Sequence, residues 1–204
     1  LDFDALSKIN PRIITCTITG YGSDGPGAGR PAFDQVAQAG GGGMSITGSD
    51  CEHPVRAGLP IGDLGGGMFG VMGILAALYE RERSGIGQHV DIAMLDCQIS
   101  MLNYIATMHC LSGKDPHPMG NAHFVHVPYD AFRCADGIIV IAVITDNFWQ
   151  NLKRVVDCPA FDNPLYDTQP GRWEHRVQIN RCLNDILERQ SCSYWLEELE
   201  KERI

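Results

Sequence analysis

Basic residues are scarce in this sequence. Its 204 residues include 16 lysines and arginines against 25 aspartates and glutamates, which gives a formal net charge of −9 at pH 7. Proteins that bind nucleic acids neutralise phosphates with clustered Lys and Arg side chains. We therefore expect no nucleic-acid partner, and at most a local basic pocket for an anion.

Paired cysteine motifs are also missing. The eight cysteines are scattered and form no C-x-x-C pair. Without a recognisable signal peptide, such spacing is typical of reduced thiols in a cytoplasmic protein, not of a disulfide framework or a zinc site. His117, His123 and His126 lie close together, but their spacing matches no zinc pattern. We expect a cytoplasmic protein without a metal, and a metal held by these histidines is the weaker alternative.

Two common catalytic motifs are absent. The sequence contains neither G-K-[ST] nor G-x-S-x-G, so a P-loop and a serine hydrolase are unsupported. Gly20, Gly22 and Gly25 match G-x-G-x-x-G. A dinucleotide site needs a helix to open inside that motif, and Pro26 with the glycines after it disfavours one.

Long apolar runs are missing too. A membrane-spanning helix needs about 20 apolar residues, and the longest candidate is interrupted by Gly70 and Gly73. We expect no membrane partner.

The periodicity of the first part predicts alternating helices and strands. Expected helices cover residues 1–9, 33–39, 68–83 and 95–110, and expected strands cover residues 12–19 and 88–94. In the third helix, apolar residues recur at positions 68, 71, 72, 75, 78 and 79, which is helical spacing. This order of elements predicts an α/β domain with parallel strands.

The composition changes near Ser112, where Gly, Pro and His become frequent. We place a domain boundary there, with a large domain over residues 1–111 and a small one over residues 112–204. In the small domain we expect a hairpin of strands 129–132 and 138–143 around Asp136-Gly137, followed by helices over 147–156 and 176–190. The second domain is therefore predicted to be α+β.

One carboxylate, Asp63, stands among glycines in the stretch GLPIGDLGGGMFG. Aspartate is a favoured N-cap, which alone would explain this position. The surrounding glycines, however, cost helix propensity, and a cap does not require them. Both readings stay open and are compatible, because a helix N-terminus favours negative charge and an ionised carboxylate can act as a nucleophile.

Three blocks of the sequence resemble consecutive blocks of the family III CoA-transferases. They cover residues 10–48, 58–96 and 120–143. The resemblance implies a Rossmann-like large domain, with coenzyme A as a substrate and no metal. It also implies that Asp63 attacks an acyl-CoA thioester and forms an aspartyl anhydride, then an aspartyl-CoA thioester, from which a carboxylic acid takes the CoA.

The same resemblance suggests the other site residues. Arg30, Phe33 and Asp34 match the block that lines the CoA cleft, and a surface charge is the equal alternative for Arg30. Gly65 and Gly66 would make room for the thioester and supply N–H donors. A substrate loop that keeps water from the anhydride would be formed by Gly120, Asn121, Ala122 and His123.

Two alternatives remain. The first is a related α-methylacyl-CoA racemase. Those enzymes use a histidine where this sequence has Phe33, and because phenylalanine cannot transfer a proton, the transferase is favoured over the racemase. The resemblance also implies an N-terminal block before Leu1, a C-terminal return and an interlocked homodimer. We therefore expect a central fragment of such an enzyme, and an inactive CoA-binding or dimerisation fragment is the second alternative.

Overall fold

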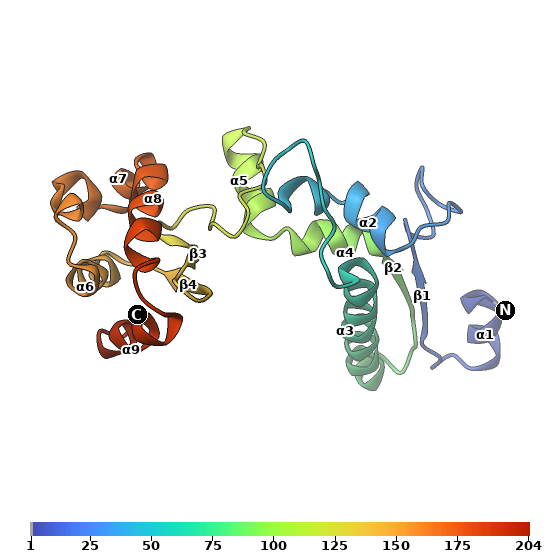
Figure 1. The fold of residues 1–204 in the computed structure, drawn as a ribbon. Coiled ribbons are helices and arrows are strands. Elements are labelled where there is room, and N and C mark those ends of the chain that lie inside the picture. Colours follow the sequence, from blue (N-terminus) through green and yellow to red (C-terminus); the bar gives the residue numbers. More distant parts are fainter. Residues whose placement is uncertain (1) are drawn as a thin grey trace. The chain divides into compact units, whose positions relative to one another are not determined.

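The structure is a computed structural model that describes residues 2–204 (Figure 1). The chain divides into two compact units, of which the first ends at Pro118 and the second spans Met119–Ile204. Each unit is described by itself.

The first unit contains a parallel pair of strands. Its elements are α1 (Phe3–Ile9), β1 (Thr15–Thr19), α2 (Asp34–Gly40), the 3-10 helix η1 (Met44–Ile46), α3 (Ile61–Ser84), β2 (His89–Ala93), α4 (Met94–Met101) and α5 (Tyr104–Ser112). In the sheet, Thr15 lies opposite His89 and Thr19 opposite Ala93. Parallel strands need a long crossover, and here it carries α2 and α3, with α3 beside the strands (Figure 1). The predicted α/β class is confirmed.

The longest helix, α3, contacts the sheet through its small residues. Gly66 and Gly70 lie against Ile18, and a Cβ atom added to Gly73 would come within 2.5 Å of Cγ1 of Val90. The apolar residues on which the helix prediction rested are largely exposed, among them Met68, Val71, Met72, Leu75 and Tyr79. The helix is confirmed and starts earlier than predicted. Glycines, rather than the large apolar residues, form the side that faces the strands.

The expectation that no apolar segment reaches membrane-spanning length was wrong. Helix α3 has 24 residues, and its most apolar window has a mean hydropathy of 1.6. Gly70 and Gly73 do not interrupt the helix, because their close contacts with the strands stabilise it. Length and composition alone do not separate a membrane span from a helix that packs in a globular domain.

The predicted single helix over residues 95–110 is two helices, α4 and α5. The break falls at Leu102 and Asn103, where Asn103 has φ +51°. With ψ −126°, Asn103 lies outside both helical regions, so the helical period continues in the sequence while the chain leaves the helix at this residue.

The second unit is built around an antiparallel hairpin. Its elements are β3 (Tyr129–Arg133), β4 (Ile138–Ala142), α6 (Asp146–Val156), the 3-10 helices η2 (Pro159–Asp162) and η3 (Pro164–Asp167), α7 (Gln169–Glu174), α8 (Arg176–Leu187) and α9 (Cys192–Lys201). Phe132 pairs with Ile139 across the hairpin, and both join a buried cluster that includes Trp149 and Leu183. The predicted hairpin and its α+β surroundings are confirmed.

Candidate active site

Asp63 is the third residue of α3, whose N-cap is Pro60. The Asp63 side chain is exposed and makes no hydrogen bond or ion pair with residues 2–204. The interpretation of Asp63 as the N-cap was therefore wrong. Its carboxylate lies at the first turn of the helix and accepts no hydrogen bond from the N–H groups of that turn.

Asp34 supplies the missing cap from another helix. Its Oδ1 atom accepts hydrogen bonds from the backbone N–H of Gly62 at 2.8 Å and, more weakly, from that of Asp63 at 3.4 Å. The first N–H groups of a helix have no partner within the helix and are commonly satisfied by such an oxygen. Because Asp34 takes this role, the carboxylate of Asp63 remains available.

The glycines around Asp63 allow close packing of neighbouring elements. A Cβ atom would meet α2 at Gly62, α4 at Gly65, and both β1 and α4 at Gly66, in each case within 3.2 Å. Only Gly67 of these four has no atom within 4 Å of that position. Packing against neighbouring elements is thus a reason for glycine at positions 65 and 66, beside the room they would leave for a thioester.

Phe33 and Arg30 precede the capping residue. Phe33 is the N-cap of α2, and its ring is 77% exposed. Arg30 is exposed as well, and its guanidinium makes no hydrogen bond or ion pair within the described part of the chain. The contact of Asp34 with α3 brings Phe33 and Asp63 into one region of the first unit.

The predicted substrate loop lies in the second unit, and Asp63 lies in the first. Gly120 has φ +63°, a conformation that favours glycine. The His123 ring stacks on Tyr129 with centroids 4.9 Å apart. Its Nδ1 atom accepts hydrogen bonds from the N–H groups of Val125 at 2.9 Å and His126 at 3.2 Å. Partial burial, and then the proximity of His126, lower the pKa of His123.

A fully buried arginine holds the backbone that follows this loop. Nε of Arg172 donates to the carbonyl of Val127 at 2.8 Å, and its Nη2 donates to Oδ1 of Asp146, also at 2.8 Å. Gln169 donates to the carbonyl of Val125. Side chains from α6 and α7 therefore fix the backbone just after the predicted substrate loop.

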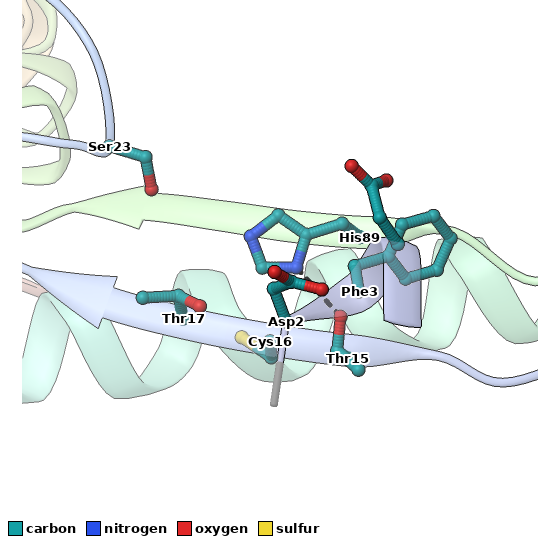
Figure 2. A pocket seen from close by; sticks show the side chains of 8 residues that line it. Asp2, Phe3, Thr15, Cys16, Thr17, Ser23 and His89 are labelled. Atoms are coloured by element: carbon teal, nitrogen blue, oxygen red, sulfur yellow. Dashed lines mark hydrogen bonds between the residues drawn. The ribbon is translucent and has the colours of Figure 1, made fainter. Parts of the chain in front are cut away.

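A separate polar cavity lies beside the sheet and contains none of the predicted site residues. Its volume is about 640 Å³, and Figure 2 shows Thr15, Thr17 and His89 from the strands with Asp2 and Phe3 near α1. Nδ1 of His89 and Oγ1 of Thr15 are hydrogen-bonded at 2.7 Å. Among residues 2–204, no group of three or more His, Cys, Asp or Glu side chains is placed to hold a metal ion.

Comparison with known sequences connects this geometry to a family. Residues 1–204 match the family described as CoA-transferase family III. The chain belongs to the family III CoA-transferases. Its relatives include a succinate–glutarate CoA-transferase of Agrobacterium fabrum, 36% identical over 90% of this chain and 46% of the relative. An acetyl-CoA:oxalate CoA-transferase of Acetobacter aceti is 34% identical over 98% of this chain and 52% of the relative.

A solved structure supports the family and the fold. A CAIB/BAIF family protein from Brucella suis superposes with a TM-score of 0.84 and 33% identity, over 100% of this chain and 54% of that protein. The chain thus spans about half the length of the family III relatives it matches. The resemblance stated from the sequence blocks is confirmed.

One buried polar residue near Asp63 was not predicted from the sequence. Gln38 is 1% exposed and hydrogen-bonded to Asp34. The spacing of these two residues on one helix was visible in the sequence, but nothing in it indicated that α3 would begin beside them.

Proposed function

We propose that this protein moves CoA from an acyl-CoA to a free carboxylic acid, with Asp63 as the nucleophile. The observation that carries the proposal is the exposed Asp63 carboxylate, which the cap from Asp34 leaves free of hydrogen bonds. Membership of the family III CoA-transferases supports the reaction class.

The proposed first half-reaction transfers CoA to Asp63. A carboxylate oxygen of Asp63 attacks the thioester carbonyl, the C–S bond breaks, and CoA leaves as a thiolate. The thiolate then attacks the Asp63 carbonyl of the resulting anhydride and releases the donor acid. Asp63 is left as a CoA thioester, which stores the activated acyl bond.

The second half-reaction runs the same chemistry in reverse order. The acceptor carboxylate attacks the Asp63 thioester and expels the thiolate, which gives a new mixed anhydride. Attack of the thiolate on the acceptor carbonyl releases the new acyl-CoA and restores the Asp63 carboxylate. No step needs a metal or a redox cofactor.

We propose a dicarboxylic acid as a substrate, because the names of both relatives above contain one: succinate and glutarate in one, oxalate in the other. Arg30 and Phe33 would line the CoA cleft of a CoA-binding domain over residues 1–111. The exposed ring of Phe33 offers an apolar surface, and the unpaired guanidinium of Arg30 offers a positive charge for a phosphate or carboxylate. Asp34 would act in that cleft by capping α3.

The residues Gly120, Asn121, Ala122 and His123 are proposed to form the substrate loop of the small domain, residues 112–204. The backbone held at Val127, just after the loop, and the positive φ of Gly120 suit a loop that covers an anhydride. We further propose a homodimer in the cytoplasm. The scattered spacing of the cysteines, without a C-x-x-C pair, is typical of a reducing compartment and supports this proposal.

Trapping the intermediate tests the proposed function. The protein is incubated with succinyl-CoA, quenched with hydroxylamine and digested, and the peptides are mapped by mass spectrometry. We expect a hydroxamate on Asp63, and none in the Asp63→Asn variant. Asp24, exposed in the glycine-rich loop, is the matched control, and Asp24→Asn should be labelled like the wild type. Absence of the label from wild-type Asp63 would contradict the nucleophile assignment.

The same incubation in D₂O separates the transferase from a racemase. Racemisation exchanges the α-proton of the acyl group with solvent, whereas CoA transfer leaves it in place. Because Phe33 cannot accept a proton, we expect no deuterium at the α-carbon.

A further inference from the structure

The carboxamide of Gln38 is buried between α2 and the segment that leads into α3. Its Nε2 atom donates to Oδ2 of Asp34 at 2.8 Å and, at the longer distance of 3.4 Å, to the carbonyl of Leu59. Its Oε1 atom accepts from the backbone N–H of Ala57 at 2.8 Å. Both N–H groups and the oxygen of the amide are therefore used.

These contacts fix the orientation of the amide. Exchanging its oxygen and nitrogen would place an NH₂ group against the N–H of Ala57 and an oxygen against the Asp34 carboxylate. Both contacts would be repulsive, and buried polar groups without partners are costly. Gln38 therefore has one favourable arrangement, and it joins α2 to residues 57–59.

The connection continues through Asp34 to the proposed nucleophile. While Oδ2 of Asp34 accepts from Gln38, Oδ1 accepts from the backbone of Gly62 at 2.8 Å and of Asp63 at 3.4 Å. The carboxylate of Asp34 thus lies between the Gln38 amide and the first turn of α3. Loss of the Gln38 amide would remove the hydrogen bond on Oδ2 of Asp34, whose other oxygen caps the start of the helix.

We propose that Gln38 is a positioning residue, which sets the location of the Asp63 carboxylate through Asp34 and through the backbone of Ala57 and Leu59. Asp63 has no side-chain hydrogen bond of its own with residues 2–204. Its position consequently depends on its backbone, and that backbone is held at Gly62 and Asp63 by Asp34. Displacement of a reacting group by about 1 Å can cost about 100-fold in rate.

Two substitutions at Gln38 test this inference, which rests on the proposed function. Gln38→Met keeps the approximate volume and removes all three hydrogen bonds. Gln38→Glu keeps the shape but presents a carboxylate oxygen to Asp34. If the methionine variant does not fold, the glutamate variant provides the same test.

The matched control is Gln98, the other buried glutamine among the described residues. It lies in α4 against Gly41 and Gly43, and its Oε1 has no hydrogen-bond partner in the structure. Gln98→Met changes a buried amide of the same kind without touching residues 57–63.

The first measurement is hydrogen exchange of the Gly62 and Asp63 amides in the whole protein, with thermal unfolding alongside. We expect exchange at these amides to become faster by about tenfold or more in both Gln38 variants, as expected when their hydrogen-bond acceptor is displaced, and to be unchanged in Gln98→Met. Unchanged exchange in both Gln38 variants would overturn the inference, whatever the activity.

The second measurement is the rate of adduct formation at Asp63 with succinyl-CoA. We expect a decrease of about 10-fold to 100-fold for the Gln38 variants, with KM for succinyl-CoA within twofold of wild type and the Gln98→Met rate unchanged. A purely structural role would instead lower the amount of active protein and leave the rate per active site as it was. That result would overturn the positioning role while Asp63 remained the nucleophile, whereas absence of the adduct in wild type would overturn the proposed function and this inference together.

Discussion

In the second unit the largest side chains are the most buried, whereas in the first unit many large apolar side chains are exposed. The aromatic and aliphatic residues Phe132, Trp149 and Leu183 are at most 1% exposed in the hairpin unit. In the α3 unit, Met72 and Leu75 are more than half exposed, and glycines occupy the contact with the strands. The second unit is stabilised by its own core, and the first by side chains of the strands and of α4 that pack directly against the glycine backbone of α3.

Loss of a large core side chain should therefore have the greatest effect in the second unit. Trp149 is 0% exposed and packs on Phe161, with ring centroids 5.2 Å apart. We expect Trp149→Ala to lower the free energy of unfolding by about 3–5 kcal/mol, measured by urea denaturation. Leu196→Ala, at an exposed site of the same unit, should change it by less than about 0.5 kcal/mol. A loss below about 1 kcal/mol for Trp149→Ala would contradict the contrast between the two units.

Addition of one methyl group should have the next largest effect, in the first unit. The new Cβ of Gly73→Ala would lie 2.5 Å from Cγ1 of Val90, so α3 or β2 must shift. We expect a loss of about 1–3 kcal/mol. Gly67→Ala on the same helix has open space and should stabilise the protein by up to about 1 kcal/mol. Equal melting temperatures for the two variants would show that glycine packing is unimportant.

Acidification should loosen the second unit near His123 before its core is affected. The pKa of His123 is lower in the folded protein than its ordinary value of about 6.5. Between these two pKa values, the unfolded chain binds more protons than the folded chain. The stabilisation from neutral His123 is present above the ordinary pKa and is lost as pH falls through the lower folded pKa. We expect the protection of the Val125 and His126 amides, measured by NMR hydrogen exchange relative to the intrinsic rate at each pH, to fall on acidification, and to show no such pH dependence in His123→Phe. A His123 pKa above 6.5 by NMR titration would contradict this.

The smallest effect is expected on the exposed side of α3. Met72 is 53% exposed, and Met72→Ser in this chain should change the free energy of unfolding by less than about 0.5 kcal/mol. A loss above about 1 kcal/mol by urea denaturation would mean that this side is covered in solution. Large apolar side chains would then be buried in both units, and the contrast in burial between the units would be smaller.

Elements defined by local signals could be predicted from the sequence. The hairpin follows from β-rich runs around Asp136-Gly137, and the end of α3 from Gly85, which has φ +77°. The side of α3 that faces the sheet could not be predicted in this way. Its glycines and its large apolar residues both recur at helical spacing, and only the nearby strands determine which of them are buried.

The candidate site shows the same limit. The prediction of Asp63 as the nucleophile rests on its glycine surroundings and on the family resemblance, whereas its prediction as the N-cap of α3 was wrong. The oxygen that holds the start of α3 comes from Asp34, 28 positions before Gly62. A partner at that separation becomes apparent only once α2 and α3 are packed together, and the role of Gln38 depends on the same packing.

The cap from Asp34 also makes the side chain at position 63, the proposed nucleophile, exchangeable. Because Asp34 of α2 caps the first turn of α3, the side chain at position 63 is not needed to stabilise the start of the helix. An Asp63→Asn chain keeps its backbone and offers an inert template on which an intact acyl-CoA can be captured and viewed. Glutamate or cysteine at the same place would present a longer or softer nucleophile on an unaltered scaffold, so the chemistry can be varied without redesigning the fold.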